Sequence, residues 1–425
     1  APFPFQFKQE GTLSSMLPAF NEDILVDEDK GNVLADYNVL LQSNQSIVAF
    51  LNTASTIRVN SILNIKYFRD VNYHDCPVFD LKKCQSDPNL FASVDIEGNL
   101  FVWKIVYIQS GQAFEIIPKL QSTMGNGKKI IVWKSEILLS TWSDKSVEFW
   151  TISNEESASL EDVIPAADKY EMRQFQSTIL DFCFSKKNNL FYLSFENGTL
   201  GIFNSESFTK IKDFEPFPLQ KCIKVFGFTD IFKERIGPGL KDIFITISDT
   251  YKAKVWDLNQ WNEETKQYSC IQEIDILSAK NKNNSLEEMR KIEFIWNDKM
   301  DLLFVWKSLK NNKNLMTIFH VSSEYTEGND PLSSINTDFF AGRKEIGLPS
   351  DSTLFSLDFI CYPELQFEMY FQNEFKESLF ANSILSQMTK IPTMLGIFGL
   401  SATNIRIFIL SKENATSLEK NANIY

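Results

Sequence analysis

The apolar positions of this chain fall into pairs of short runs separated by polar turns, and one such phrase returns four times. Its copies are 95–103 (DIEGNLFVW), 144–150 (DKSVEFW), 196–203 (ENGTLGIF) and 249–256 (DTYKAKVW). Each copy follows another apolar run, so each unit predicts a hairpin of two apolar strands around a tight turn. The closing aromatic residues lie 47, 53 and 53 residues apart. This repeat length is typical of the blades of a β-propeller.

The central strands of a blade are covered on both faces, and the sequence fits this requirement. Residues 100–105 (LFVWKI) are nearly continuous in apolar side chains, as expected of strands buried on two sides. The pair Asn197-Gly198 suits a two-residue hairpin turn, because both positions there need positive φ. Only 255–257 (VWD) carries the Trp-Asp dipeptide of the WD repeat. The pattern therefore predicts an all-β fold, a seven-bladed WD40-like β-propeller with degenerate repeats and long inter-blade loops.

Two sets of residues receive structural roles in this prediction. The blade aromatics, which we expect in the core, are Trp103, Trp150, Phe203 and Trp256. The turn residues, which we expect before the second strand of each hairpin, are Asp95, Gly98, Asp144, Gly198 and Asp249. The aspartates could instead form a ring of acids, but their position favours side chains that cap local backbone amides.

The length of 425 residues leaves room around the blades. Seven blades of ~40 to 45 residues need roughly 300 residues, and we assign the propeller to 44–411. Residues 1–43 are predicted to be an N-terminal arm, for which we hypothesise a strand that closes the ring. Residues 412–425 are predicted to be a polar tail that leads to a linker outside this chain.

Three segments within the propeller interrupt its rhythm. Residues 154–176 form an acidic stretch that we expect as an insertion between the third and fourth blades. Residues 323–351 have little periodicity and are rich in Gly, Ser and Asp, which predicts a loop. Residues 377–388 place apolar side chains at helical spacing. Such a stripe would either dock on the propeller or face a partner.

Charge and composition narrow the classes of function. The net charge is −13, which argues against a surface built for phosphate backbones, so we expect no direct binding of nucleic acid. The most apolar stretch, 394–410, is interrupted by polar residues and does not predict a membrane span. The 37 phenylalanines either fill the layers between blades or, where exposed, anchor a partner. Six scattered cysteines without CxxC pairs indicate buried thiols in a reducing compartment.

Candidate catalytic chemistry is sparse. The chain has two histidines. His74 lies between Tyr73 and Asp75 and is predicted to occupy a surface loop, although a histidine beside an acid and Cys76 could also be part of a nucleophile pair. His320 is predicted to be a strand residue. Residues 124–129 (MGNGKK) lack the full spacing of a phosphate loop and are predicted to be a turn. We therefore assign no catalytic, cofactor-binding or metal-binding residue, and we expect no enzyme.

One blade carries a family resemblance. Residues 90–105 (LFASVDIEGNLFVWKI) resemble the phrase L-x-x-x-D-x-x-G-N-L-F-V-W in the N-terminal WD-like propeller of the enhancer-of-mRNA-decapping scaffolds, the Hedls/Varicose family. Segments 129–152, 178–203 and 242–261 fit in order, so the resemblance covers roughly 45–320. The chain departs from the family at Phe203, where Trp is usual, and in the long loop after residue 322.

The resemblance implies a non-catalytic platform in cytoplasmic mRNA decay. Such a scaffold recruits the mRNA-decapping enzyme or its activators in processing bodies, and its partners would be proteins gripped through loop faces or blade edges. Two alternatives remain open at this stage. One is an adaptor propeller of another assembly, such as a vesicle coat, a nuclear pore or a ubiquitin ligase. The other is a propeller that binds RNA directly. The sequence assigns no partner-binding residues.

Overall fold

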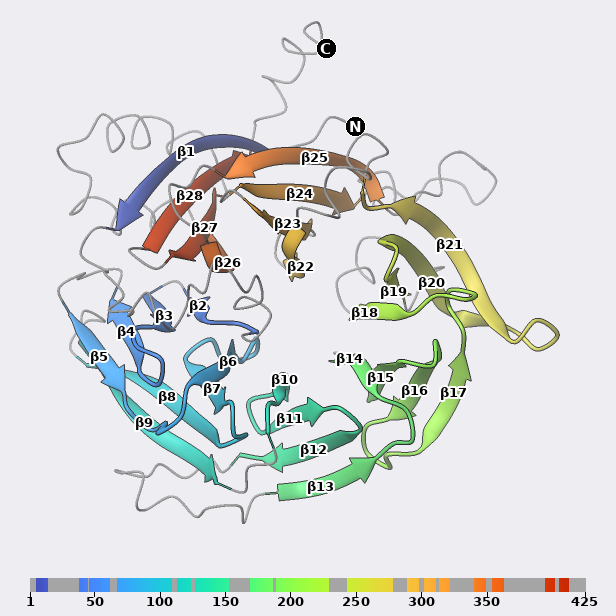
Figure 1. The fold of residues 1–425 in the computed structure, drawn as a ribbon, viewed down its shortest axis with the longest axis horizontal. Helices are drawn as coiled ribbons and strands as arrows, with labels where there is room; N and C mark the ends of the chain where they lie inside the picture. Colours follow the sequence, from blue (N-terminus) through green and yellow to red (C-terminus); the bar gives the residue numbers. More distant parts are fainter. Residues whose placement is uncertain are drawn as a thin grey trace, which may run out of the picture.

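The described residues form seven four-stranded antiparallel sheets, which stand radially around a common axis (Figure 1). The structure is a computed structural model. The structure describes residues 5–13, 38–44, 46–61, 67–108, 113–123, 127–152, 169–185, 189–228, 243–277, 289–297, 302–310, 313–321, 340–348, 354–362, 394–401 and 405–412. Each sheet has its first strand next to the axis and its last strand at the rim. The prediction of an all-β propeller is confirmed.

The first four blades follow one another along the chain. Blade 1 consists of β2 (Leu41–Ser43), β3 (Ile47–Leu51), β4 (Ile57–Ser61) and β5 (Phe68–Val71). Blade 2 consists of β6 (Val78–Lys83), β7 (Leu90–Asp95), β8 (Leu100–Ile108) and β9 (Ala113–Ser122). Blade 3 consists of β10 (Ile130–Ser135), β11 (Leu138–Ser143), β12 (Ser146–Thr151) and β13 (Lys169–Gln174). Blade 4 consists of β14 (Ile179–Phe184), β15 (Leu190–Phe195), β16 (Leu200–Asn204) and β17 (Lys210–Phe214).

The remaining sheets complete the circle. Blade 5 consists of β18 (Cys222–Phe228), β19 (Ile243–Ser248), β20 (Lys252–Asn262) and β21 (Gln267–Asp275). Blade 6 consists of β22 (Met289–Asn297), β23 (Leu302–Leu309), β24 (Asn314–Val321) and β25 (Phe340–Leu348). The last sheet consists of β26 (Leu354–Tyr362), β27 (Met394–Ser401), β28 (Ile405–Lys412) and β1 (Phe5–Leu13).

The last sheet draws its outer strand from the other end of the chain. β1 pairs antiparallel with β28, from Phe5 opposite Lys412 to Leu13 opposite Ile405. In Figure 1 the blue first strand lies beside the red last one. The N-terminal arm therefore supplies a strand that joins the two ends of the ring.

The core of the molecule lies between neighbouring blades. All six residues of β7 are buried, as are all six of β19. One apolar cluster contains Val102 of blade 2 and Leu139 of blade 3, and another contains Val255 of blade 5 and Val305 of blade 6. Burying each such side chain stabilises the fold by about 1.5 to 3 kcal/mol, so the blades are held mainly by their flanks.

Outer strands account for most differences from the predicted organisation. The acidic stretch 154–176 was predicted between blades 3 and 4, but β13 within it is the fourth strand of blade 3. The predicted loop 323–351 contains β25, the outer strand of blade 6. The predicted boundary at residue 44 is also wrong, because β2 already belongs to blade 1. Outer strands pack on one neighbour only, so their sequences show little apolar pattern.

Two further predictions concern segments 377–388 and 412–425. The first lies outside the described residues, as does the second beyond residue 412. Within the described part of the chain, no helix is long and apolar enough to cross a membrane.

Candidate functional site: the central channel and the blade interiors

The inner strands of the blades enclose a cavity of about 540 Å³ on the propeller axis. Its walls combine aromatic and apolar side chains with charged ones. The charged residues that line it are Lys82, Asp181, Lys224, Glu293 and Asp358. Acids and lysines that converge in a cavity can bind a ligand or transfer protons. The contacts of each charged group decide what it can do.

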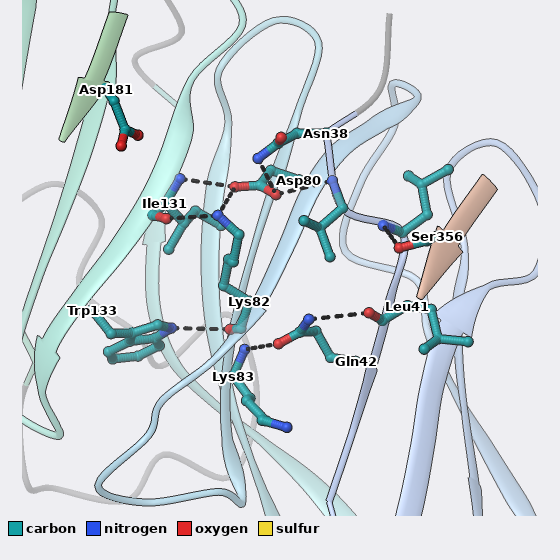
Figure 2. Close-up of polar contacts among 12 residues, drawn as sticks. Asn38, Leu41, Gln42, Asp80, Lys82, Lys83, Ile131, Trp133, Asp181 and Ser356 are labelled. Atoms are coloured by element: carbon teal, nitrogen blue, oxygen red, sulfur yellow. Dashed lines mark hydrogen bonds and ion pairs between the residues drawn. The ribbon is translucent and has the colours of Figure 1, made fainter. Parts of the chain in front are cut away.

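Asp80 is the centre of the best-defined contacts near this cavity. A β-bulge between Val78 and Asp80 redirects the start of β6. The Asp80 carboxylate accepts hydrogen bonds from the Asn38 side chain (3.0 Å), the backbone N–H of Val39 (3.2 Å) and the backbone N–H of Ile131 (2.9 Å). Figure 2 shows these bonds converging on one side chain. One buried carboxylate thus ties β6 to the chain entering β2 and to β10.

Other inner strands use the same device. Asp181 follows a bulge in β14 and accepts the backbone N–H of Val225 in β18 (2.8 Å). Ser356 follows a bulge in β26, and its hydroxyl accepts the backbone N–H of Leu40 (3.2 Å). The side chain is placed after the bulge because the extra residue turns it toward the neighbouring blade. Polar groups at the channel wall therefore satisfy backbone donors that the next blade leaves unpaired.

The lysines that line the cavity, Lys82 and Lys224, and the neighbouring Lys83 lie close to carboxylates. Lys82 Nζ lies 3.3 Å from Asp80 Oδ2 and donates to the Ile131 carbonyl (3.1 Å). Lys224 Nζ lies 3.6 Å from Asp181 Oδ1. Lys83 Nζ contacts Asp358 Oδ2 at 3.1 Å. Because each ammonium has a carboxylate partner, the cations and acids of the wall largely neutralise one another.

Glu293 on β22 differs from the other acids. Its Oε2 atom is buried and has no hydrogen-bond partner within the described part of the structure. Burial raises the pKa of the Glu293 carboxyl, while the nearby charges of Lys291, Lys82 and Lys224 oppose that rise. The channel thus holds one carboxyl group with hydrogen-bonding capacity to spare. Among the described residues, no group of three or more His, Cys, Asp or Glu side chains is placed to hold a metal ion.

Comparison with solved structures identifies the architecture. The WD40 domain of coronin from Toxoplasma gondii superposes with a TM-score of 0.56 over 95% of this chain and 85% of that one, at 12% sequence identity. The fold is a WD40-type β-propeller. A chain from the mitotic checkpoint complex matches with a TM-score of 0.50 over 95% of this chain and 93% of its own, at 10% identity. No protein-family model and no curated protein matches the sequence. The resemblance to the Hedls/Varicose scaffolds thus receives no support from these sequence comparisons.

The WD40-type blades place the predicted aromatics inside the molecule. Trp103, Trp150, Phe203 and Trp256 are all buried. In three of the four, the indole N–H donates to a hydroxyl on the neighbouring strand. The acceptors are Ser93 for Trp103 (3.3 Å), Thr141 for Trp150 (2.9 Å) and Thr246 for Trp256 (2.8 Å). Phe203 has no such donor and stacks on Phe191 instead, with ring centroids 5.0 Å apart.

The predicted turn residues lie in the hairpin turns between the second and third strands. Asp95 Oδ1 accepts the backbone N–H groups of Glu97 and Asn99 (3.0 Å each), so it caps its own turn. Gly98 has φ of 89° and Gly198 has φ of 90°, a region that favours glycine. Asp144 itself adopts positive φ, at 42°, and accepts a bond from the Thr178 hydroxyl.

Asp249 lies in the corresponding turn of blade 5. Its backbone N–H donates to the Lys221 carbonyl (2.9 Å), which ties this turn to the segment before β18. The residue is exposed. These aspartates therefore sit in separate hairpin turns, in blades 2, 3 and 5.

His74 is buried, and its prediction as a surface-loop residue is wrong. His74 Nδ1 lies 3.1 Å from Asp95 Oδ2, and Nε2 lies 2.8 Å from Ser93 Oγ. Since a carboxylate only accepts, Nδ1 carries the proton that faces Asp95, and in the neutral tautomer Nε2 accepts from the Ser93 hydroxyl. Burial alone would raise the pKa of Asp95, but hydrogen bonds from His74 and Asn99 lower it. Sequence reasoning missed this network because its members lie 19 and 21 residues apart.

Ser93, His74 and Asp95 have the connectivity of a hydrolytic triad. Such a triad acts only if a substrate can reach the serine hydroxyl. The side chains of His74 and Asp95 have 0% exposure, and Ser93 is also fully buried. Ser93 Oγ further accepts the Trp103 indole N–H. A substrate carbonyl could not approach this hydroxyl without displacing the core of blade 2. The arrangement therefore stabilises the blade, and it joins the third strand to the loop that precedes the first.

The glycine-lysine segment 124–129 is described only from Gly127 onward. Gly127 has φ of 92°, and its N–H donates to the Glu97 carbonyl (3.0 Å). Lys129 forms a buried ion pair with Glu148 (2.9 Å). The second lysine of the segment is thus committed to a contact within blade 3. His320, predicted to be a strand residue, is in β24 and lies opposite Leu302 of β23.

Proposed function

We propose that this propeller is a non-catalytic platform for protein–protein interactions. The observation that carries the proposal is the use of its reactive side chains. Asp80 and Asp181, on the inner strands β6 and β14, accept backbone N–H groups of neighbouring blades. The one serine–histidine pair that the described residues form is sealed inside blade 2. What the ring offers to other molecules is its loops and blade edges, which are the surfaces that bind peptides and proteins.

The more specific form of the proposal is a scaffold of cytoplasmic mRNA decapping, located in processing bodies. It rests on the resemblance of residues 90–105 to the decapping scaffolds. The parts of that phrase have defined positions: Asp95 and Gly98 form the turn, and Trp103 packs in the core. These positions are compatible with the family, and the partner would be the decapping enzyme or one of its activators.

The test is affinity capture with the full chain as immobilised bait in lysate of the cells that express it, at physiological salt. We expect the decapping enzyme or its activators to be retained and identified by mass spectrometry. A fluorescent fusion should also collect in processing bodies. Retention of coat, nuclear-pore or ubiquitin-ligase subunits without decapping factors would overturn the decapping role and leave the platform role intact.

RNA binding provides the opposing outcome. The net charge of −13 disfavours contact with a phosphate backbone. We expect a fluorescently labelled 30-nucleotide RNA to show no binding at 150 mM salt and micromolar protein. Binding under these conditions would contradict the platform proposal in favour of a direct RNA-binding propeller.

A further inference from the structure

The turn that leads from blade 4 into blade 5 displays an unusual residue. Leu219 is fully exposed to solvent, more so than any other large apolar side chain of the described residues. The Gln220 N–H donates to the Phe217 carbonyl (3.1 Å), which closes a four-residue turn with Pro218 in its second position. Leu219 occupies the third position with φ of 62°. This combination of features defines a type II turn.

A leucine is poorly suited to that position. The third residue of a type II turn needs positive φ and is usually Gly or Asn. A bulky L-residue there is strained, because its Cβ approaches the carbonyl oxygen. Full exposure adds no burial energy to offset the strain. The sequence therefore keeps a residue that opposes the local backbone preference, and such outliers cluster at functional sites.

The segment that leads into the turn is fastened to blade 5, which restricts where the leucine can lie. Phe217 is buried beside it. Lys254 Nζ donates to the Pro216 carbonyl (3.0 Å), and Gln267 Nε2 donates to the Glu215 carbonyl (3.0 Å). The anchoring residues lie on β20 and β21 of blade 5. A side chain presented by such a fixed turn loses little conformational freedom on binding.

Acidic side chains outnumber basic ones near the Leu219 turn. Glu215 of the same loop is exposed, as are Glu196 and Asp249 of the adjacent hairpin turns. Lys221 is ion-paired with Glu196, and its carbonyl accepts the Asp249 N–H. Three carboxylates and two lysines, Lys221 and Lys254, thus lie in or beside the loop that carries the exposed leucine. The complementary surface would combine an apolar pocket with basic side chains at its edge.

We propose that Leu219 is an anchor residue that inserts into an apolar pocket on a partner protein, with Lys and Arg side chains at the edge of that pocket. The inference rests on the proposed platform function and deepens it by naming the contact and the chemistry of the partner. The leucine fills the pocket, and Glu215 and Asp249 pair with its basic edge. A buried anchor inside a charged rim is the usual anatomy of a strong interface.

The test compares wild type with L219N as bait in the cell lysate, with I211N as matched control. Ile211 is another exposed apolar residue of blade 4, at 50% exposure, but it lies in β17. We expect one set of proteins to be retained by wild type and I211N, and to fall about tenfold or more with L219N. A zero-length carbodiimide, which joins a carboxylate to an amine with loss of water, should link Glu215 or Asp249 to lysines of those proteins.

L219N should also raise the midpoint of thermal unfolding, by about 1 to 2 °C, because Asn tolerates positive φ. Lost binding in a more stable protein cannot result from misfolding. Equal retention by wild type and L219N would overturn the docking role while leaving the platform intact. Retention of nothing by wild type would overturn both. If the wild-type protein self-associates and L219N does not, then Leu219 binds a second copy of this chain, which would contradict the proposal.

Discussion

Blades 4 and 5 are neighbours with the same strand pattern, but they stabilise their interiors differently. In blade 5, Trp256 lies opposite Phe244, and its indole N–H donates to Thr246 two residues further along β19. In blade 4, Phe203 lies opposite Phe191, and the residue two further along β15 is Leu193, which is buried. In blade 4, Phe203 therefore stands where blade 5 has the donor Trp256, and Leu193 stands where it has the acceptor Thr246. Because both positions are apolar, no hydrogen-bonding group is left unsatisfied.

What the two blades share is the stacked aromatic pair. Phe244 stacks on Trp256 with an interplanar angle of 17°, and Phe191 stacks on Phe203 at 8°. Replacing both partners of a buried hydrogen bond with apolar groups is nearly neutral, whereas removing one is costly. The stacking of rings is thus the common requirement of these blades, and the hydrogen bond is an addition that blade 4 omits.

The largest effect is expected when blade 4 receives half of the polar pair. L193T removes apolar volume from a fully buried site and adds a hydroxyl with no indole donor opposite it. We expect the free energy of unfolding to fall by about 3 to 4 kcal/mol. Urea denaturation followed by intrinsic fluorescence measures the change.

The matching double variant sharpens this result. In L193T/F203W the new indole can donate to the new hydroxyl, so the two changes should couple favourably by about 1 kcal/mol. F203W alone should be destabilising through overpacking, because the Phe203 ring already lies against Gly201. Strict additivity in the double-mutant cycle would contradict our account of the pair.

The next effect concerns blade 2, where the polar network is most extended. H74A removes the group that bridges Asp95 and Ser93 and leaves both with an unfilled hydrogen-bonding position. We expect a loss of about 2 to 3 kcal/mol in the free energy of unfolding. Y73F, which alters the adjacent side chain by one hydroxyl, is the control and should cost much less. A loss with Y73F as large as that with H74A would show that the loop, and not the network, matters.

A smaller effect is expected from W256F in blade 5. It leaves the Thr246 hydroxyl without its indole donor and should cost about 1 to 1.5 kcal/mol. Changing the partner too, in T246V/W256F, should recover most of this cost and bring blade 5 close to the state of blade 4. Denaturant midpoints of the two variants give the comparison. If T246V/W256F has a lower free energy of unfolding than W256F, the two side chains act independently.

The smallest effect is a dependence on pH. The pKa of Asp95 is lowered in the folded protein, so its ionised form contributes stability that is present above the unfolded pKa of about 3.9 and is lost as the pH falls through the folded pKa. Wild type should therefore exceed D95N in thermal midpoint by a constant margin between about pH 5 and 7. The margin should narrow below about pH 4. A margin that widens on acidification would have the wrong sign for this mechanism.

The repeated central strands could be predicted from the sequence because their signal is local. The spacing of Trp103, Trp150 and Trp256 identifies the third strand of a blade, and Gly98 and Gly198 identify its turn. Phe203 was recognised as an exception. Its compensation by Leu193 could not be seen, because nothing in the sequence alone states which residue of β15 faces it.

The channel contacts could not be predicted, because they join residues far apart in sequence. Asp80 accepts from Val39 and Ile131, at separations of 41 and 51 residues. His74 was misplaced for a similar reason, since its neighbours in sequence are not its partners in space. β25 was missed because an outer strand needs little apolar pattern. In each case the decisive interaction connects two strands or blades, and no local pattern records it.

The pairing of β1 with β28 has a consequence for biosynthesis. Residues 14–404 lie between the two strands, and ribosomes add about 5 to 20 residues per second. β1 consequently leaves the ribosome about 20 to 80 s before its partner exists. Throughout that interval the nascent polypeptide carries an unsatisfied strand that could pair wrongly with any open sheet edge. A chaperone that shields this segment until translation ends would favour correct closure of the circle.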